Sequence, residues 1–227
     1  SMTATPIPRS AALVLAGGYQ LYTLLETPKP RHVQTVLAAT PAEKKMVMQQ
    51  AMAELERGGK IIVIYPAIES TAMRSIKQAE KIWSKLWMEP LVTVHGKSED
   101  AEGNIQKFRT GAARVMLASV KIEVGIDIPS ATMIIIADAE RFGLATLHQL
   151  RGRVGRGGLP GYCMVLSDNQ NAMERLRFFS QCQNGFKLAE FDMCRRGTGE
   201  VQGTIQSGHI SRFFRIDKDL ELLKESL

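Results

Sequence analysis

Short apolar runs alternate with longer amphipathic segments between residues 32 and 166. The runs predicted to be strands are His32–Ala38, Ile61–Tyr65, Leu91–His95, Arg114–Ala118, Met133–Ala137 and Tyr162–Leu166. Most of their residues are apolar, as expected of strands covered on both faces of a parallel sheet. Because helical segments of about ten or more residues separate them, the pattern indicates right-handed βαβ units in an α/β fold.

Capping residues and glycines delimit the helices between these strands. Thr40-Pro41-Ala42-Glu43 is a capping box with proline at the first helical position, and Gly58-Gly59 predicts the end of that helix. Further helices are expected at residues 70–86, from Ser98 or Asp100 to Phe108, and at Leu144–Gly152. Ligands of a parallel sheet bind beyond the carboxyl ends of its strands, so the site is expected in the loops at that edge.

The regular alternation ends after Asp168. Residues 171–183 and 186–194 are predicted to form a helical hairpin, with an ordered glycine-rich loop at residues 195–208 that is neither helix nor strand. We therefore expect three parts: residues 1–30, which do not fit the alternation and look like the tail of a preceding domain, an α/β domain at 31–168, and a hairpin with a hook loop at 169–227.

Composition narrows the class of protein. Hydrophobic residues make up 44% of the 227 residues and charged residues 23%, as in an ordinary globular protein. The net charge of +6 and the pI near 9.3 favour a polyanionic partner such as nucleic acid. Three scattered cysteines suggest a reducing compartment, four dispersed histidines indicate no metal site, and no apolar run is long enough to span a membrane.

The segment Gln149–Arg156, with the letters QLRGRVGR, carries the clearest chemistry. Leu144, Leu147, Leu150 and Val154 recur at helical spacing and can face the core. Gln149, Arg153 and Arg156 fall on a different stripe, and Gly152 and Gly155 remove bulk beside the arginines. This arrangement suits guanidinium groups that reach a phosphate, although a solvated basic face is the alternative interpretation.

Three other segments could contact a polyanion. Ser119 ends a predicted strand, and the loop after it contains Gly125 and Asp127, which suit a phosphate and a ribose hydroxyl, or only an ordinary connection. His95-Gly96 ends another strand, where a histidine is more often structural than catalytic. Thr3-Ala4-Thr5-Pro6 could be a plain turn.

Taken together and in this order, these segments resemble motifs III to VI of superfamily-two helicases. The matching segments are Thr3–Thr5, Ile61–Pro66, Val94–Gly96, Ile122–Pro129 and Gln149–Arg156. Ala139–Leu144 and the stretch His148–Gly157 resemble the RecG family of branched-DNA translocases more specifically. The tail, Arg196–Glu200 with Gly203–His209, resembles the translocation motif that this family shares with transcription-repair coupling factors.

The resemblance implies a second RecA-like helicase lobe, with ATP and Mg²⁺ bound mainly by a first lobe outside this sequence. Arg153 and Arg156 would be arginine fingers on the γ-phosphate, and Gln149 would couple the nucleotide to lobe closure. The remaining roles implied are nucleotide contact for Gly125 and Asp127, and DNA contact or coupling for Thr3, Thr5, His95, Gly96, Ser119, Arg196 and Gln206. The implied partners are branched double-stranded DNA and the first lobe and wedge domain of the same, monomeric protein, in a bacterial cytoplasm or an organelle.

Some positions depart from the family pattern. Ser119 and Val120 stand where threonines are usual, and Lys97-Ser98 follows His95-Gly96 where a methionine is usual. The chain has no G-x-x-x-x-G-K-[ST] sequence, and Gly58-Gly59-Lys60 lacks its spacing. Two alternatives therefore stay open beside a RecG-type motor half. One is the same half of a transcription-repair coupling factor, and the other is a stand-alone basic nucleic-acid-binding module without ATPase activity.

Overall fold

The computed structural model describes residues 33–66, 79–81, 83–85, 87, 90–95, 98, 100–119, 131–155 and 160–200, the last eight by their backbone alone. The chain divides into two compact units after Gln183. The strands and helices up to Gln181 belong to one unit, and helix α7 (Gly185–Glu200) belongs to the other.

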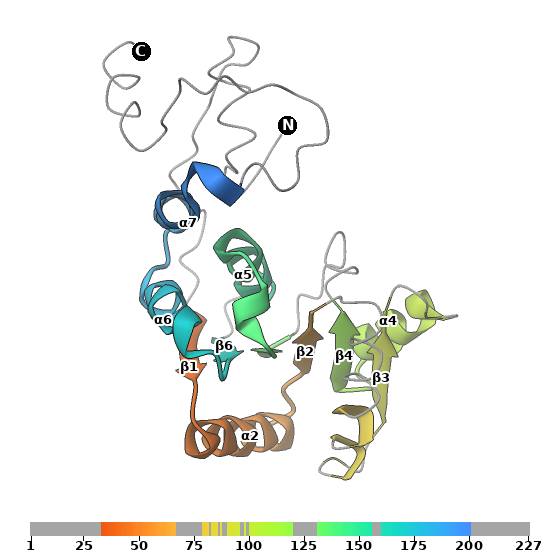
Figure 1. Cartoon of the computed structure of the whole chain (residues 1–227). Helices are drawn as coiled ribbons and strands as arrows, with labels where there is room; N and C mark the ends of the chain where they lie inside the picture. The colour runs from red at the N-terminus through yellow and green to blue at the C-terminus, as the bar shows by residue number, and fades with distance from the viewer. Residues whose placement is uncertain are drawn as a thin grey trace. The chain divides into compact units, whose positions relative to one another are not determined.

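Six parallel strands form one sheet, as the apolar runs predict (Figure 1). They are β1 (Val33–Ala38), β2 (Ile61–Tyr65), β3 (Leu91–Val94), β4 (Val115–Ser119), β5 (Met133–Ile136) and β6 (Gly161–Leu166). The order across the sheet is β1-β6-β5-β2-β4-β3, and every adjacent pair is parallel. All six predicted strands are confirmed, with no end shifted by more than one residue.

The strand order places the helices on both faces of the sheet. The chain moves in one direction from β1 to β3 and in the other from β4 to β6. Right-handed crossovers then put α2 (Pro41–Glu56) on one face, and α4 (Ala101–Thr110) and α5 (Leu144–Arg151) on the other. Figure 1 shows α2 and α5 on opposite sides of the sheet. A hydrophobic core that includes Val47, Leu55 and Trp83 fills the α2 face.

The helix ends follow from their capping residues. The Thr40 hydroxyl accepts from the Glu43 N–H, and the Glu43 carboxylate accepts from the Thr40 N–H, so the predicted capping box is present. Asp100, rather than Ser98, caps α4 by accepting from the Gly103 N–H. Ser98 instead closes a turn, because its hydroxyl accepts from the His95 N–H.

One secondary-structure prediction is wrong. Residues 195–200 were expected in a loop, but α7 continues to Glu200. Glycine weakens a helix by only about 1 kcal/mol per residue, so Gly197 and Gly199 do not suffice to end one. The first predicted helix of the pair is confirmed as the short turn η4 (Gln170–Ala172) followed by α6 (Met173–Gln181), with Met173, Leu176 and Phe179 buried.

Candidate functional site

Helix α5 carries the two predicted stripes. Leu144, Leu147 and Leu150 are buried, and Val154 is buried just beyond the helix. Gln149 is exposed and Arg153 is partly exposed, so neither belongs to the buried stripe. Arg156 lies outside the described residues.

A tight turn follows α5 and fixes where this segment lies. The N–H of Arg153 donates to the Leu150 carbonyl at 2.9 Å. Gly155 adopts a left-handed φ of +70° and packs against Val33 and Gly161, where a Cβ atom would come within 3.0 Å of the Val33 side chain. Only glycine fits both the conformation and the space. Val33 and Gly161 are the first residues of β1 and β6, so this turn lies at the amino edge of the sheet.

This position corrects the expectation that the Gln149–Arg156 segment lies at the carboxyl edge. Parallel strands all start at one edge, so a crossover helix must return the chain antiparallel to them. Helix α5 begins after the carboxyl end of β5 and runs back, which brings Arg153 to the opposite edge. The residue pattern predicts the helix and its stripes, but only the direction of return decides the edge.

The buried Arg151 anchors the carboxyl end of α5. Its side chain is 3% exposed and donates to the carbonyls of Phe179 at 3.0 Å and Cys182 at 2.9 Å. It also donates to Nδ1 of His148 at 2.9 Å and stacks on the Phe179 ring, 4.4 Å from its centroid. These carbonyls belong to the last turn of α6, where a helix leaves its C=O groups without internal partners. Arg151 thus joins α5 to α6.

Sequence reasoning missed this role, although a signal was available. Arg151 follows Leu147 by four residues and precedes Val154 by three, so it stands on the apolar stripe rather than the polar one. An arginine in a core stripe needs fixed acceptors, because burying its charge is costly otherwise. The acceptors come from a helix about thirty residues later, and the pattern around Arg151 does not reveal them.

His148 is held neutral beside Arg151. Burial, and secondarily the positive charge of Arg151, lower the pKa of His148 to about 4. Burial also lowers the pKa of Arg151 itself. Because a guanidinium has no acceptor, the bond between the two requires an unprotonated Nδ1 on His148. The pair therefore carries one charge rather than two at neutral pH.

Two of the residues expected to contact DNA lie at the carboxyl edge. Ser119 ends β4, pairs with Tyr65 of β2 and is only 5% exposed. His95 is half-buried just after β3, in the turn closed by Ser98. At this edge, Asp138 is the sole non-glycine residue with positive φ among those described, at +46°. Sequence reasoning did not single out Asp138, although aspartate after a strand tolerates this conformation.

The other expected site residues cannot be placed. Those outside the described residues are Thr3, Thr5, Gly96, Gly125, Asp127 and Gln206. Arg196 lies in α7, where only the backbone is described. The structure therefore brings together Gln149 and Arg153 at one edge and leaves Ser119 and His95 at the other.

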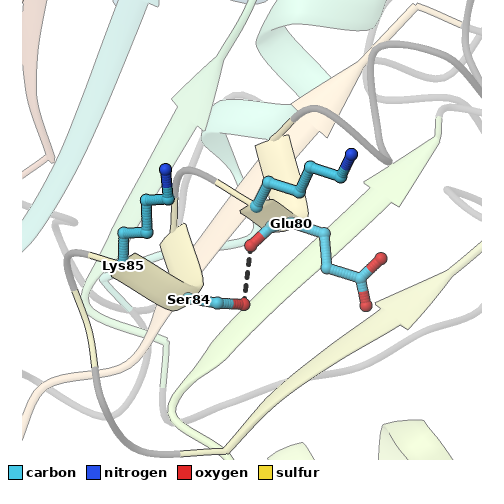
Figure 2. Close-up of a pocket in the computed structure, with 4 residues that line it drawn as sticks. Glu80, Ser84 and Lys85 are labelled. Carbon is cyan, nitrogen blue, oxygen red and sulfur yellow. Dashed lines mark hydrogen bonds between the residues drawn. The ribbon is translucent and has the colours of Figure 1, made fainter.

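The described part of the chain shows little else that resembles a site. A surface hollow is lined by Glu80, Lys81, Ser84 and Lys85, and the Ser84 hydroxyl donates to the Glu80 carbonyl (Figure 2). None of the expected residues lines it. Within the described ranges, no cluster of three His, Cys, Asp or Glu could hold a metal, and no helix is long and apolar enough to cross a membrane.

Comparison with known proteins identifies the family. Residues 43–158, about half of the chain, match the family model described as the helicase conserved C-terminal domain. The chain belongs to this helicase C-terminal domain family. It is 41% identical over 235 residues to the ATP-dependent DNA helicase RecG of Thermotoga maritima, covering 98% of this chain and 30% of that protein.

Two further matches agree. This chain is 37% identical over 237 residues to RECG1, a chloroplastic/mitochondrial ATP-dependent DNA helicase homologue of Arabidopsis thaliana. The match covers 100% of this chain and 24% of that protein. A solved structure of RecG bound to a three-way DNA junction superposes with a TM-score of 0.70 at 37% identity, over 98% of this chain and 30% of that one. The chain thus spans roughly a quarter to a third of these relatives' length, and the expected RecA-like lobe and RecG resemblance are confirmed.

Truncating the Arg151 side chain is expected to destabilise this chain strongly. Arg151→Ala leaves the Phe179 and Cys182 carbonyls without their donor and removes packing on the Phe179 ring, so the free energy of unfolding should fall by about 2–4 kcal/mol. Urea denaturation measures this. The matched control is Arg177→Ala on the exposed side of α6, expected to stay within about 0.5 kcal/mol. Equal losses in both variants would contradict the anchoring role.

Stability should also fall as the solution is acidified. The unfolded chain protonates His148 below its ordinary pKa of 6.5, whereas the folded chain does so only near 4. Protons therefore favour the unfolded state in this window, and the urea midpoint should drop as pH falls from 6.5 to 4. The His148→Gln variant should show a smaller drop, and an identical pH profile would rule out this titration.

Proposed function

We propose that this chain is the second motor lobe of an ATP-driven, RecG-type translocase of double-stranded DNA. The observation that supports this proposal is the exposure of Gln149 and, in part, of Arg153 near the amino edge of the sheet. The chain that carries this pair is 37–41% identical to RecG helicases over nearly its whole length. The whole protein would act on branched DNA, reversing stalled forks and migrating Holliday junctions in recombination and repair. The relative's structure on a three-way DNA junction supports this substrate class.

The geometry suits a phosphate-sensing role for this pair. Arg153 stands between the anchor Arg151 and the tight turn at Gly155, so its backbone is held from both sides. Arg153 is partly exposed, and its held backbone limits the places that its guanidinium can reach, which favours charge stabilisation of an anion at a set position. Arg153 and Arg156 would serve as the arginine fingers, and Gln149 would sense the same phosphate.

The amino edge would then face the first lobe, which would bind ATP and Mg²⁺. Gly125 and Asp127 would contribute to the nucleotide cleft. Ser119, His95 and Gly96 would approach the DNA backbone at the carboxyl edge, with Ser119 limited by its burial. Thr3, Thr5, Arg196 and Gln206 would couple nucleotide turnover to DNA movement.

Other partners follow from the same assignment. The first lobe and a wedge domain of the same monomeric protein would complete the enzyme. The relatives are bacterial and organellar, which supports a bacterial cytoplasm or an organelle as its location. The RecG names of relatives at this identity favour this assignment over a transcription-repair coupling factor.

The arginine-finger assignment predicts a selective loss of turnover. In a full-length protein containing this chain, Arg153→Ala should lower kcat for ATP hydrolysis by about 10³–10⁵-fold, because the charge that develops on the phosphoryl oxygens loses its partner. Affinity for a branched duplex should stay near wild type. Phosphate release and DNA anisotropy measure the two properties, with Arg177→Ala as control. Undiminished turnover would refute the assignment.

The chain alone is expected to hydrolyse no ATP. It lacks a G-x-x-x-x-G-K-[ST] sequence, whose backbone N–H groups and lysine cradle the phosphates. A malachite-green assay with branched DNA should therefore show no release above the buffer blank. Multiple turnover by the isolated chain would overturn the two-lobe proposal.

A further inference from the structure

A second basic region lies at the amino edge of the sheet, away from α5. It comprises five residues around the starts of β2 and β4, which we call the basic amino-edge surface: Arg57, Lys60, Lys107, Arg109 and Arg114. Arg57 and Lys60 flank the Gly58-Gly59 turn, which does not have the spacing of a nucleotide-binding loop. The roles proposed above assign nothing to this region.

Direct contacts bring its parts together. The Lys60 ammonium donates to the Arg109 carbonyl at 2.9 Å, which ties the loop before β2 to the end of α4. The N–H of Ile61 donates to the Arg114 carbonyl at 2.9 Å. The Arg114 guanidinium donates to the Leu55 carbonyl at 2.6 Å, near the end of α2. These contacts tie together the segment after α2, the end of α4 and the residues before β2 and β4.

Lys60 and Arg114 act as anchors, and the other three charges point outward. Lys60 and Arg114 are half-buried, whereas Lys107 and Arg109 are exposed and the Arg57 side chain is 73% exposed. No described atom outside the neighbouring residues lies within 4 Å of the Cβ position at Gly58, next to Arg57.

The charge balance is positive. Against the five basic side chains stand two carboxylates on the last turn of α2, Glu54 and Glu56. Glu54 is buried and lies 3.7 Å from Arg57. Basic residues at a helix end also offset its dipole, but Lys60 already binds a terminal carbonyl of α4. Lys107 and Arg109 add two further positive charges at the same helix end.

From this arrangement we infer that the basic amino-edge surface binds the phosphate backbone of duplex DNA, in addition to the contacts proposed at the carboxyl edge. Duplex DNA carries a negative charge about every 1.7 Å along its axis, so exposed flexible cations bind it without fixed geometry. An acidic protein partner would need carboxylates placed to match these five basic residues. The wide spacing of the basic residues does not favour such a match. The choice of DNA as polyanion rests on the proposed function.

The test uses the whole 227-residue chain. The double variant Lys107→Gln/Arg109→Gln removes two exposed charges and keeps the Arg109 carbonyl that binds Lys60. The matched control, Lys45→Gln/Arg177→Gln, removes two exposed charges from α2 and α6. Anisotropy of a short labelled duplex, titrated at several salt concentrations, reports Kd and the slope of log K against log salt. Thermal melting reports folding.

The double variant should bind the duplex more weakly and lose about two units of slope, since each lost phosphate contact removes about 0.9. The control should behave as wild type. Unchanged Kd and slope in the double variant, with or without a lower melting temperature, would overturn the inference and leave helix compensation or an acidic protein partner as the explanation. Equal loss in the control would also overturn it. Wild-type chain that binds no duplex would instead count against the proposed function.

Discussion

The parallel direction of all six strands is the constraint from which the arrangement of this lobe follows. Each crossover helix must run back against the strands, so each helix begins at the carboxyl edge and ends at the amino edge. The chemistry is thereby divided in two. Arg153 and the basic amino-edge surface share one edge, whereas Ser119, His95 and Asp138 share the other.

Residues at the two edges can affect one another only through the sheet and the helices between them. The described contacts include a candidate link of this kind. Helix α5 runs from the carboxyl edge to the amino edge, and Leu144, Leu147 and Leu150 are buried along its length.

The buried Arg151 shows how a charged side chain can hold the end of a helix inside the fold. Its donors satisfy the carbonyls at the end of α6, which would otherwise lack partners, and its ring contact with Phe179 adds packing. The lowered pKa of His148 belongs to the same arrangement, because burial, and secondarily the positive charge of Arg151, disfavour a second charge there. Arg151 and Arg153 have the same side chain, yet Arg151 is buried and Arg153 is partly exposed.

The local sequence was enough to predict the strands, the α2 capping box and the apolar stripe of α5. These depend on neighbours within a few residues, where periodicity and capping chemistry act. The family motifs also lie in continuous segments, so the RecA-like lobe could be named from them. The pattern of residues along this segment could not show that Arg151 is buried while Arg153 is partly exposed. It also could not show at which edge of the sheet the two residues lie. The burial of Arg151 depends on carbonyl acceptors of α6, and the edge depends on contacts with β1 and β6. These elements are distant from α5 in sequence and meet it only once the sheet has formed.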